Sequence, residues 1–154
     1  MTFARRTLAG LTVIAAGLGL GVATASPAAA ATGTWRAYGN TNPITSSSAT
    51  WHCAGSKTIA TSVVAQVCAI RSAGGGAVQG AVIVRNNRSA LFSVDASMDL
   101  YTSSSTKLGF WSCASSGVGA NSWSVCFGQT LTQSSSVDSA GTAKGVGLGV
   151  SPFV

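Results

Sequence analysis

ALFSVDASMDLY, residues 90–101, is the most regularly alternating stretch of this chain. From position 92 onward, apolar and polar residues alternate along the chain. The apolar set is Phe92, Val94, Ala96, Met98 and Leu100, and the polar set is Ser93, Asp95, Ser97 and Asp99. A two-residue period is typical of a β-strand with one buried and one solvated face. The stretch therefore predicts a strand in a sheet that is covered on one side.

The segments on both sides of this strand have a similar character. Short runs rich in Val, Ile, Ala and aromatic residues are separated by turns of Gly, Asn, Ser and Thr. We expect strands within residues 59–72, 78–85, 108–114, 122–131 and 137–154, with turns at 74–76, 86–87 and 102–106. This pattern predicts an all-β fold, a small antiparallel sandwich or barrel, and it does not decide between those two.

Residues 1–31 have the layout of a secretory signal peptide. Two arginines near the start precede an uncharged apolar stretch at residues 8–22, and a run of small residues with an A-x-A site follows. The apolar stretch is too short and too rich in Gly for a membrane anchor. We therefore expect a secreted, extracellular protein with no membrane anchor, whose mature chain starts at Ala31 or Thr32.

Four cysteines in an exported chain indicate two disulfides. Two segments resemble one another, WHCAGS at 51–56 and WSCASS at 111–116, and each precedes a Val-Cys pair. The repeat predicts two similar hairpins, each closed by its own bridge, each bridge stabilising by about 3 kcal/mol in the chain-entropy model. The predicted pairs are Cys53 with Cys68 and Cys113 with Cys126. A zinc site is disfavoured, because Cys-x-x-Cys spacing is absent and the chain has one histidine.

The charge is weakly positive and scattered. Nine Lys and Arg residues against three Asp and no Glu give a formal net charge of +6. Without the two arginines of the predicted signal, seven basic and three acidic residues would leave +4. Nucleic-acid-binding proteins normally gather Lys and Arg on one face. We expect a solvated surface and no nucleic-acid partner.

Residues 32–48 are polar, rich in Gly, and without a sustained two-residue or helical period. This composition predicts an extended or mobile N-terminal arm ahead of a disulfide-bonded β domain at residues 49–154. The arm carries aromatic and Arg residues, the types that dominate binding hot spots. The candidate partner-binding residues are Trp35, Arg36, Tyr38 and Ile44. In the alternative interpretation, Trp35 folds back onto the domain.

No arrangement of residues indicates catalysis. His52 is the single histidine, and no Gly-x-Ser-x-Gly motif accompanies it. Asp95 and Asp99 share a strand face, but four residues of strand separate their backbones by about 13 Å, a long spacing for glycoside hydrolysis. The glycines at 74–76 lack the Lys-Ser and helix of a phosphate loop. We expect a non-enzymatic protein with no cofactor and no metal.

Trp51, Trp111 and Trp123 admit two interpretations. They could form a platform for stacking sugars, but such residues more often pack beside disulfides in a small core. We expect the core role.

With its predicted signal, its Gly-, Ser-, Thr- and Ala-rich mature part, and its two Trp-x-Cys segments, the chain resembles small exported proteins of actinobacteria. It is similar to the small adaptor subunit of their umbrella toxin particles. The resemblance implies a non-enzymatic adaptor between a large repeat-containing toxin scaffold and a lectin subunit. It also implies that residues 32–44 enter the cleft of a degenerate trypsin-like domain, with Arg36 as the residue that the cleft accepts.

Two other classes remain open. A secreted protease inhibitor would also use an extended segment bearing an arginine, although Arg36 lies outside both predicted disulfide loops. A small-molecule carrier of the β-sandwich type is the other alternative.

Overall fold

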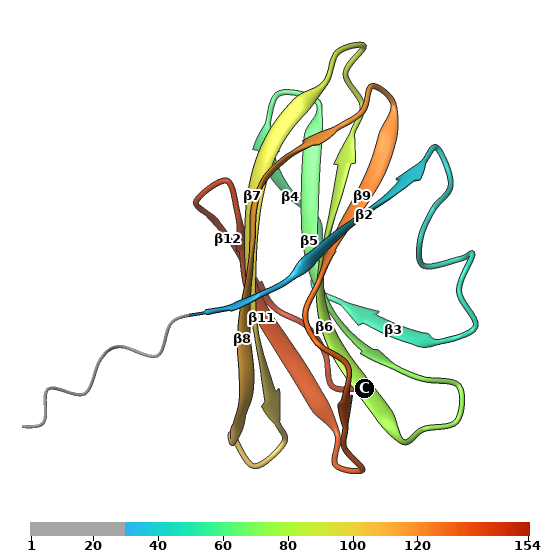
Figure 1. Ribbon diagram of the computed structural model, residues 1–154, viewed down its shortest axis with the longest axis vertical. Coiled ribbons are helices and arrows are strands. Elements are labelled where there is room, and N and C mark those ends of the chain that lie inside the picture. The colour runs from blue at the N-terminus through green and yellow to red at the C-terminus, as the bar shows by residue number, and fades with distance from the viewer. Residues whose placement is uncertain (1–29) are drawn as a thin grey trace, which may run out of the picture.

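The computed structural model describes residues 30–154, in which two sheets pack face to face (Figure 1). This part of the chain contains strands and no helix, so the all-β prediction is confirmed, as a sandwich and not a barrel. Within it, no helix is long and apolar enough to cross a membrane. The predicted signal peptide falls on residues 1–31, of which residues 1–29 lie outside the described part.

The five-stranded sheet has the order β1-β8-β7-β11-β12. All its pairings are antiparallel except the short parallel pair of β1 and β8. Its strands are β1 (Ala31–Thr32), β7 (Phe92–Thr102), β8 (Lys107–Val118), β11 (Val137–Ala143) and β12 (Val146–Val150).

The seven-stranded sheet has the main path β2-β9-β6-β5-β3, with β10 paired to β6 and β4 paired to β5. All of its pairings are antiparallel. Its strands are β2 (Thr34–Gly39), β3 (Thr50–Cys53), β4 (Lys57–Ala60), β5 (Val63–Arg71), β6 (Ala77–Asn86), β9 (Ser122–Phe127) and β10 (Leu131–Thr132).

The core between the sheets contains the apolar face predicted for residues 92–101. Every second side chain of β7 from Phe92 to Leu100 is at most 8% exposed. These side chains face apolar residues of the other sheet, including Val67, Val78 and Val82. The two-residue period of β7 thus reflects burial on one side alone.

Two predicted strands are each broken in two. Residues 59–72 form the end of β4 and all of β5, because the chain turns at Ser62, whose φ is 58°. Residues 122–131 form β9, a short connection and β10. The composition did not reveal either break, since the residues of the two connections, 61–62 and 128–130, also occur within strands.

Both predicted disulfides are present, and no cysteine is free. Cys53 and Cys68 are directly opposite one another in the β3–β5 ladder. Cys113 and Cys126 join β8 to β9, which belong to different sheets. The prediction that each bridge closes a hairpin is therefore wrong for Cys113–Cys126, because β8 and β9 pair with other strands and the bridge connects the two layers.

The prediction of a separate N-terminal arm at residues 32–48 is also wrong. Ala31 and Thr32 pair with β8 of the five-stranded sheet, and residues 34–39 pair with β9 of the seven-stranded sheet. The segment is extended as predicted, but the backbone crosses from one sheet to the other at Gly33, whose N–H donates to Ser112. Backbone pairing over both sheets makes this segment part of the β domain.

Candidate functional site

An apolar cluster covers the outer face of the seven-stranded sheet. Its residues alternate with core residues along β5, β6 and β9, so they point away from the other sheet. We call it the outer-face cluster; its buried members are Cys68, Ile70, Ala81, Ile83 and Val125.

Strand β2 lies at the edge of the sandwich (Figure 1). Successive side chains of a strand point to opposite faces of its sheet. In the β2–β9 ladder, Trp35 is opposite Cys126 and Arg36 is opposite Val125. Cys126 belongs to the core between the sheets, whereas Val125 belongs to the outer-face cluster. Trp35 therefore points inward and Arg36 points outward.

Trp35 is held by the domain itself. Its indole N–H donates a hydrogen bond of 2.8 Å to the carbonyl oxygen of Ala114 on β8, and its ring packs against the core. The prediction that Trp35 projects from an arm toward a partner is wrong, because the ring and its N–H both have partners within the sandwich. The alternative interpretation, in which Trp35 folds back onto the domain, describes the structure.

Arg36 and Tyr38 lie together on the outer face. The guanidinium carbon of Arg36 is 5.1 Å from the centroid of the Tyr38 ring, a cation–π contact. Arg36 is exposed, and Tyr38 is half-buried against the outer-face cluster. The contact favours this placement of the guanidinium and leaves it accessible to solvent.

Residues 40–49 fold back over the same face. The side-chain oxygen of Asn42 accepts a hydrogen bond of 2.9 Å from the backbone N–H of Ile44, and its carbonyl accepts one of 3.2 Å from Ser46. Pro43 is buried, and Ile44 packs against the outer-face cluster. Ile44 therefore anchors the loop to the outer face of the seven-stranded sheet.

An open hollow of about 480 Å³ lies between β2 and this loop. Of the four residues predicted to bind a partner, Arg36 and Tyr38 line it, Ile44 belongs to the loop at its border, and Trp35 points the other way. The loop residues that complete the lining were not predicted, because small polar residues show no pattern that separates a folded loop from a free one. They are Thr41, Pro43, Ser46, Ser47 and Ser48.

Among residues 30–154, strand β2 is also an edge strand. It ends the main path of the seven-stranded sheet, and β9 is its neighbour in that sheet. An edge strand presents backbone N–H and C=O groups with which another strand can pair. Arg36, Tyr38 and the hollow therefore adjoin a sheet edge of the kind to which a further strand can be added.

The three tryptophans considered above pack within the fold. Trp111 is 2% exposed between the sheets. Trp51 and Phe127 meet edge to face on the outer-face cluster, with ring centroids 6.0 Å apart, and the Arg85 guanidinium carbon is 5.3 Å from the Trp123 ring centroid. These contacts favour the packing role over a sugar platform.

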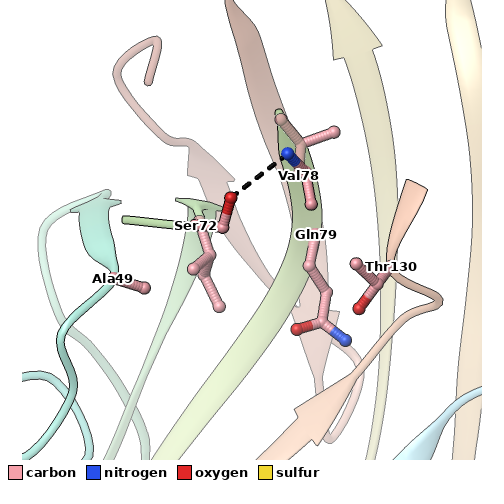
Figure 2. A pocket seen from close by; sticks show the side chains of 7 residues that line it. Ala49, Ser72, Val78, Gln79 and Thr130 are labelled. Atoms are coloured by element: carbon pink, nitrogen blue, oxygen red, sulfur yellow. Dashed lines mark hydrogen bonds between the residues drawn. The ribbon is translucent and has the colours of Figure 1, made fainter. Parts of the chain in front are cut away.

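Figure 2 shows a small pocket beside β3, β5 and β6, which bears on the carrier alternative. Its volume is about 150 Å³. The amide of Gln79 donates to Gly128, and the hydroxyl of Ser72 accepts from the N–H of Ala77, so both polar side chains serve the fold. Pockets for drug-sized ligands usually have about 300–1,000 Å³, so this one offers little room for a carried molecule.

The residues considered for catalysis are dispersed. The ring Nδ1 of His52 hydrogen-bonds with the backbone oxygen of Phe153. Asp99 is 2.6 Å from the ammonium group of Lys107, and the hydrogen bond between them raises the pKa of Lys107. Asp95 is exposed on the same strand face. Within residues 30–154, His, Cys, Asp and Glu side chains do not gather into a group that could hold a metal ion.

No protein-family model matches this chain, and no curated protein matches it significantly in sequence.

Proposed function

We propose that this is a secreted, non-enzymatic binding protein that captures a protein partner along the edge of β2 and the hollow beside it. The observation that carries the proposal is the position of Arg36 and Tyr38: they lie on a strand that has one strand neighbour in its sheet within residues 30–154, next to a hollow of about 480 Å³. Two disulfides fit an oxidising compartment, and with the signal-like sequence at residues 1–31 they support export.

The contact would work by strand addition. A partner strand laid along β2 would extend the seven-stranded sheet through backbone hydrogen bonds, while its side chains reach the outer face. The exposed guanidinium of Arg36, oriented by Tyr38, suits a carboxylate on that strand because Arg binds carboxylates through paired N–H groups. The polar lining of the hollow would satisfy further polar groups of the partner.

The more specific role we propose is that of an adaptor in a secreted antibacterial toxin assembly, between a lectin subunit and a large repeat-containing scaffold. This role rests on the resemblance to actinobacterial umbrella toxin adaptors. In our proposal the partner docks against the edge of β2. Residues 32–44 do not enter a cleft of the partner, because entry would break the β1–β8 and β2–β9 pairings.

The inhibitor alternative receives less support. Protease inhibitors usually offer the protease a loop that stands clear of the domain, whereas Arg36 is paired with Val125 in a sheet and stacked on Tyr38.

Co-purification tests the proposal. The tagged protein and an Arg36→Glu/Tyr38→Ala variant would each be recovered from the culture fluid of the bacterium that encodes them, and bound proteins identified by mass spectrometry. Loss of a hot-spot aromatic or Arg commonly costs about 2 kcal/mol or more, roughly thirty-fold in affinity. We expect the double variant to lose a partner that the wild type retains.

Arg88→Ala is the matched control, since Arg88 also stacks on an aromatic ring, that of Phe92, but lies on the turn after β6. The control should retain the partner. Equal recovery with the double variant and the wild type, both correctly disulfide-bonded, would exclude β2 as the binding surface.

A further inference from the structure

A second hollow, of about 270 Å³, lies on the outer face of the five-stranded sheet, on the opposite side of the sandwich from the hollow beside β2. Tyr101, Asp138 and Ala140 face it because they alternate with core residues along β7 and β11. The full lining is Tyr101, Thr102, Ser105, Asp138, Ala140, Val150 and Phe153.

The apolar wall of this hollow is unusually exposed for the chain. Among residues 30–154, three large hydrophobic side chains are strongly exposed, and two of them stand here: Val150 at 58% and Phe153 at 47%. Tyr101 adds a second aromatic ring. Such side chains lose contact with water when a ligand covers them, which favours binding.

A carboxylate lies within this apolar setting. Asp138 is half-buried and directly opposite Tyr101 in the β11–β7 ladder. In the described residues, the one salt bridge joins Lys107 to Asp99 and leaves Asp138 without a cationic partner. Burial raises the pKa of Asp138 above its ordinary value, although a backbone hydrogen bond lowers it in part.

Two charged side chains near the hollow compensate one another. Lys107 is opposite Tyr101 on the other side of β7, and its ammonium lies 6.0 Å from the Tyr101 ring centroid and 2.6 Å from Asp99. Asp99 therefore compensates Lys107, and Asp138 is left without an ion-pair partner among the described residues.

The wall that carries Phe153 is held in place. Ser151 and Val154 pair by backbone hydrogen bonds with Ser139 and Val137 of β11, and His52 hydrogen-bonds with the backbone oxygen of Phe153. The Phe153 ring is thus presented by a segment fixed on both sides of it, so little order has to be created on binding.

We propose that this hollow binds a guanidinium or alkylammonium group carried on an aliphatic stem. The cation would pair with the Asp138 carboxylate beside the rings of Tyr101 and Phe153, and the stem would lie on Val150 and Ala140. The group could belong to an Arg or Lys side chain of a protein or to a free organic cation, and the chemistry is the same for both.

Titration calorimetry and NMR on the folded protein test this with matched probes. N-acetyl-arginine amide should bind and shift amide signals around Tyr101, Asp138 and Phe153. N-acetyl-citrulline amide, which has nearly the same shape without the charge, should bind about tenfold more weakly or worse. Butylguanidine, which keeps the single guanidinium and an aliphatic stem without the peptide groups, separates the sources: equal affinity indicates a free cation, and weaker affinity than the peptide-like probe indicates a protein side chain. Both outcomes support the proposed chemistry.

Asp138→Asn should weaken the arginine probe about tenfold or more, whereas Asp95→Asn, at an exposed carboxylate on the same sheet face, should leave its affinity unchanged. Phe153→Ala provides a second variant at a largely exposed position and should also weaken binding. Equal binding of the citrulline and arginine probes, or equal losses in the Asp138 and Asp95 variants, would overturn the proposal.

Discussion

The indole N–H of Trp35 donates a hydrogen bond of 2.8 Å to the carbonyl oxygen of Ala114, and this bond joins the edge strand of one sheet to a strand of the other. Trp35 also lies opposite Cys126, whose disulfide leads to Cys113 on the same strand as Ala114. A covalent bond and a side-chain hydrogen bond therefore connect β8 to the edge of the seven-stranded sheet within a few residues of one another. The N-terminal segment is a structural part of this connection.

Trp35→Phe should destabilise the protein by about 1 kcal/mol, because it keeps most of the ring and removes the donor to Ala114. Chemical denaturation of the disulfide-bonded protein, followed by tryptophan fluorescence or circular dichroism, measures this loss. Deleting residues 31–39 should have a much larger effect, since it removes both the β1–β8 and β2–β9 pairings. A truncated protein with unchanged stability would show that the segment is dispensable for folding.

Gly33→Ala should destabilise by about 1–3 kcal/mol, the usual effect of overpacking. A Cβ at position 33 would lie 2.8 Å from the sulfur of Cys113 and 2.8 Å from the carbonyl oxygen of Phe127. One neighbour is a bridged sulfur and the other is backbone, so neither can move aside easily.

Gly55→Ala is the control for this substitution, because a Cβ there meets no atom within 4 Å and the backbone φ is not in the left-handed region. Thermal unfolding of both variants makes the comparison. Equal melting temperatures for the two would mean that the chain at Gly33 adapts without cost.

The parts of the fold that could be predicted are those whose structure leaves a pattern in a short, continuous stretch of sequence. The period of β7 follows from burial on one face, and the repeated Trp-x-Cys segments indicated the correct disulfide pairs. Strand β2 left no such signal. It is paired along one edge, its side chains alternate between the core and a loop-covered face, and its contact with Ala114 spans 79 positions.

The candidate sites show the same limit. Arg36 and Tyr38 could be selected by residue type, but that Trp35 points the other way depends on the register with β9. The hollow around Asp138 combines β7, β11, β12 and the last residues of the chain. These positions approach one another through strand pairing, so no local motif could indicate them.

Arg71→Ala should destabilise the protein by about 3 kcal/mol, although sequence alone places Arg71 among scattered surface charges. Its guanidinium donates to four backbone oxygens at 2.6–3.1 Å, from Gly75, Gln133, Ser135 and Val154. These oxygens belong to the β5–β6 turn, the segment before β11 and the last described residue. Removing the guanidinium leaves partly buried acceptors without a donor.

Arg71→Lys should recover only a part of this stability. The lysine ammonium group can donate to some of these oxygens, but it cannot reproduce the planar set of donors of the guanidinium. Arg88→Ala, which removes a guanidinium that stacks on Phe92, should cost less than about 1 kcal/mol. Urea denaturation of the three variants ranks them, and an Arg71→Ala variant no less stable than Arg88→Ala would refute the bridging role.

The free energy of unfolding of the Asp138→Asn variant, minus that of the wild type, should increase as the pH rises from 3 to 7. Burial raises the folded-state pKa of Asp138 above the ordinary value of 3.8, so the folded protein holds this proton more tightly than the unfolded chain does. A raised folded-state pKa contributes stability that is present below the unfolded value and lost as the pH rises through the folded value. Asparagine carries no such proton, so the variant avoids this loss.

The measurement is the difference in free energy of unfolding, variant minus wild type, at a series of pH values and constant ionic strength. A constant offset from the amide itself cancels in such a series, and only the slope matters. The difference should increase above pH 3.8 and level off once Asp138 is ionised in both states. A flat or falling difference would mean that the carboxylate is well solvated or already paired. That result would contradict the proposed site, in which an unpaired Asp138 carboxylate attracts the cation. A rising difference would show that the fold tolerates an unpaired charge at a cost to stability, as binding sites commonly do.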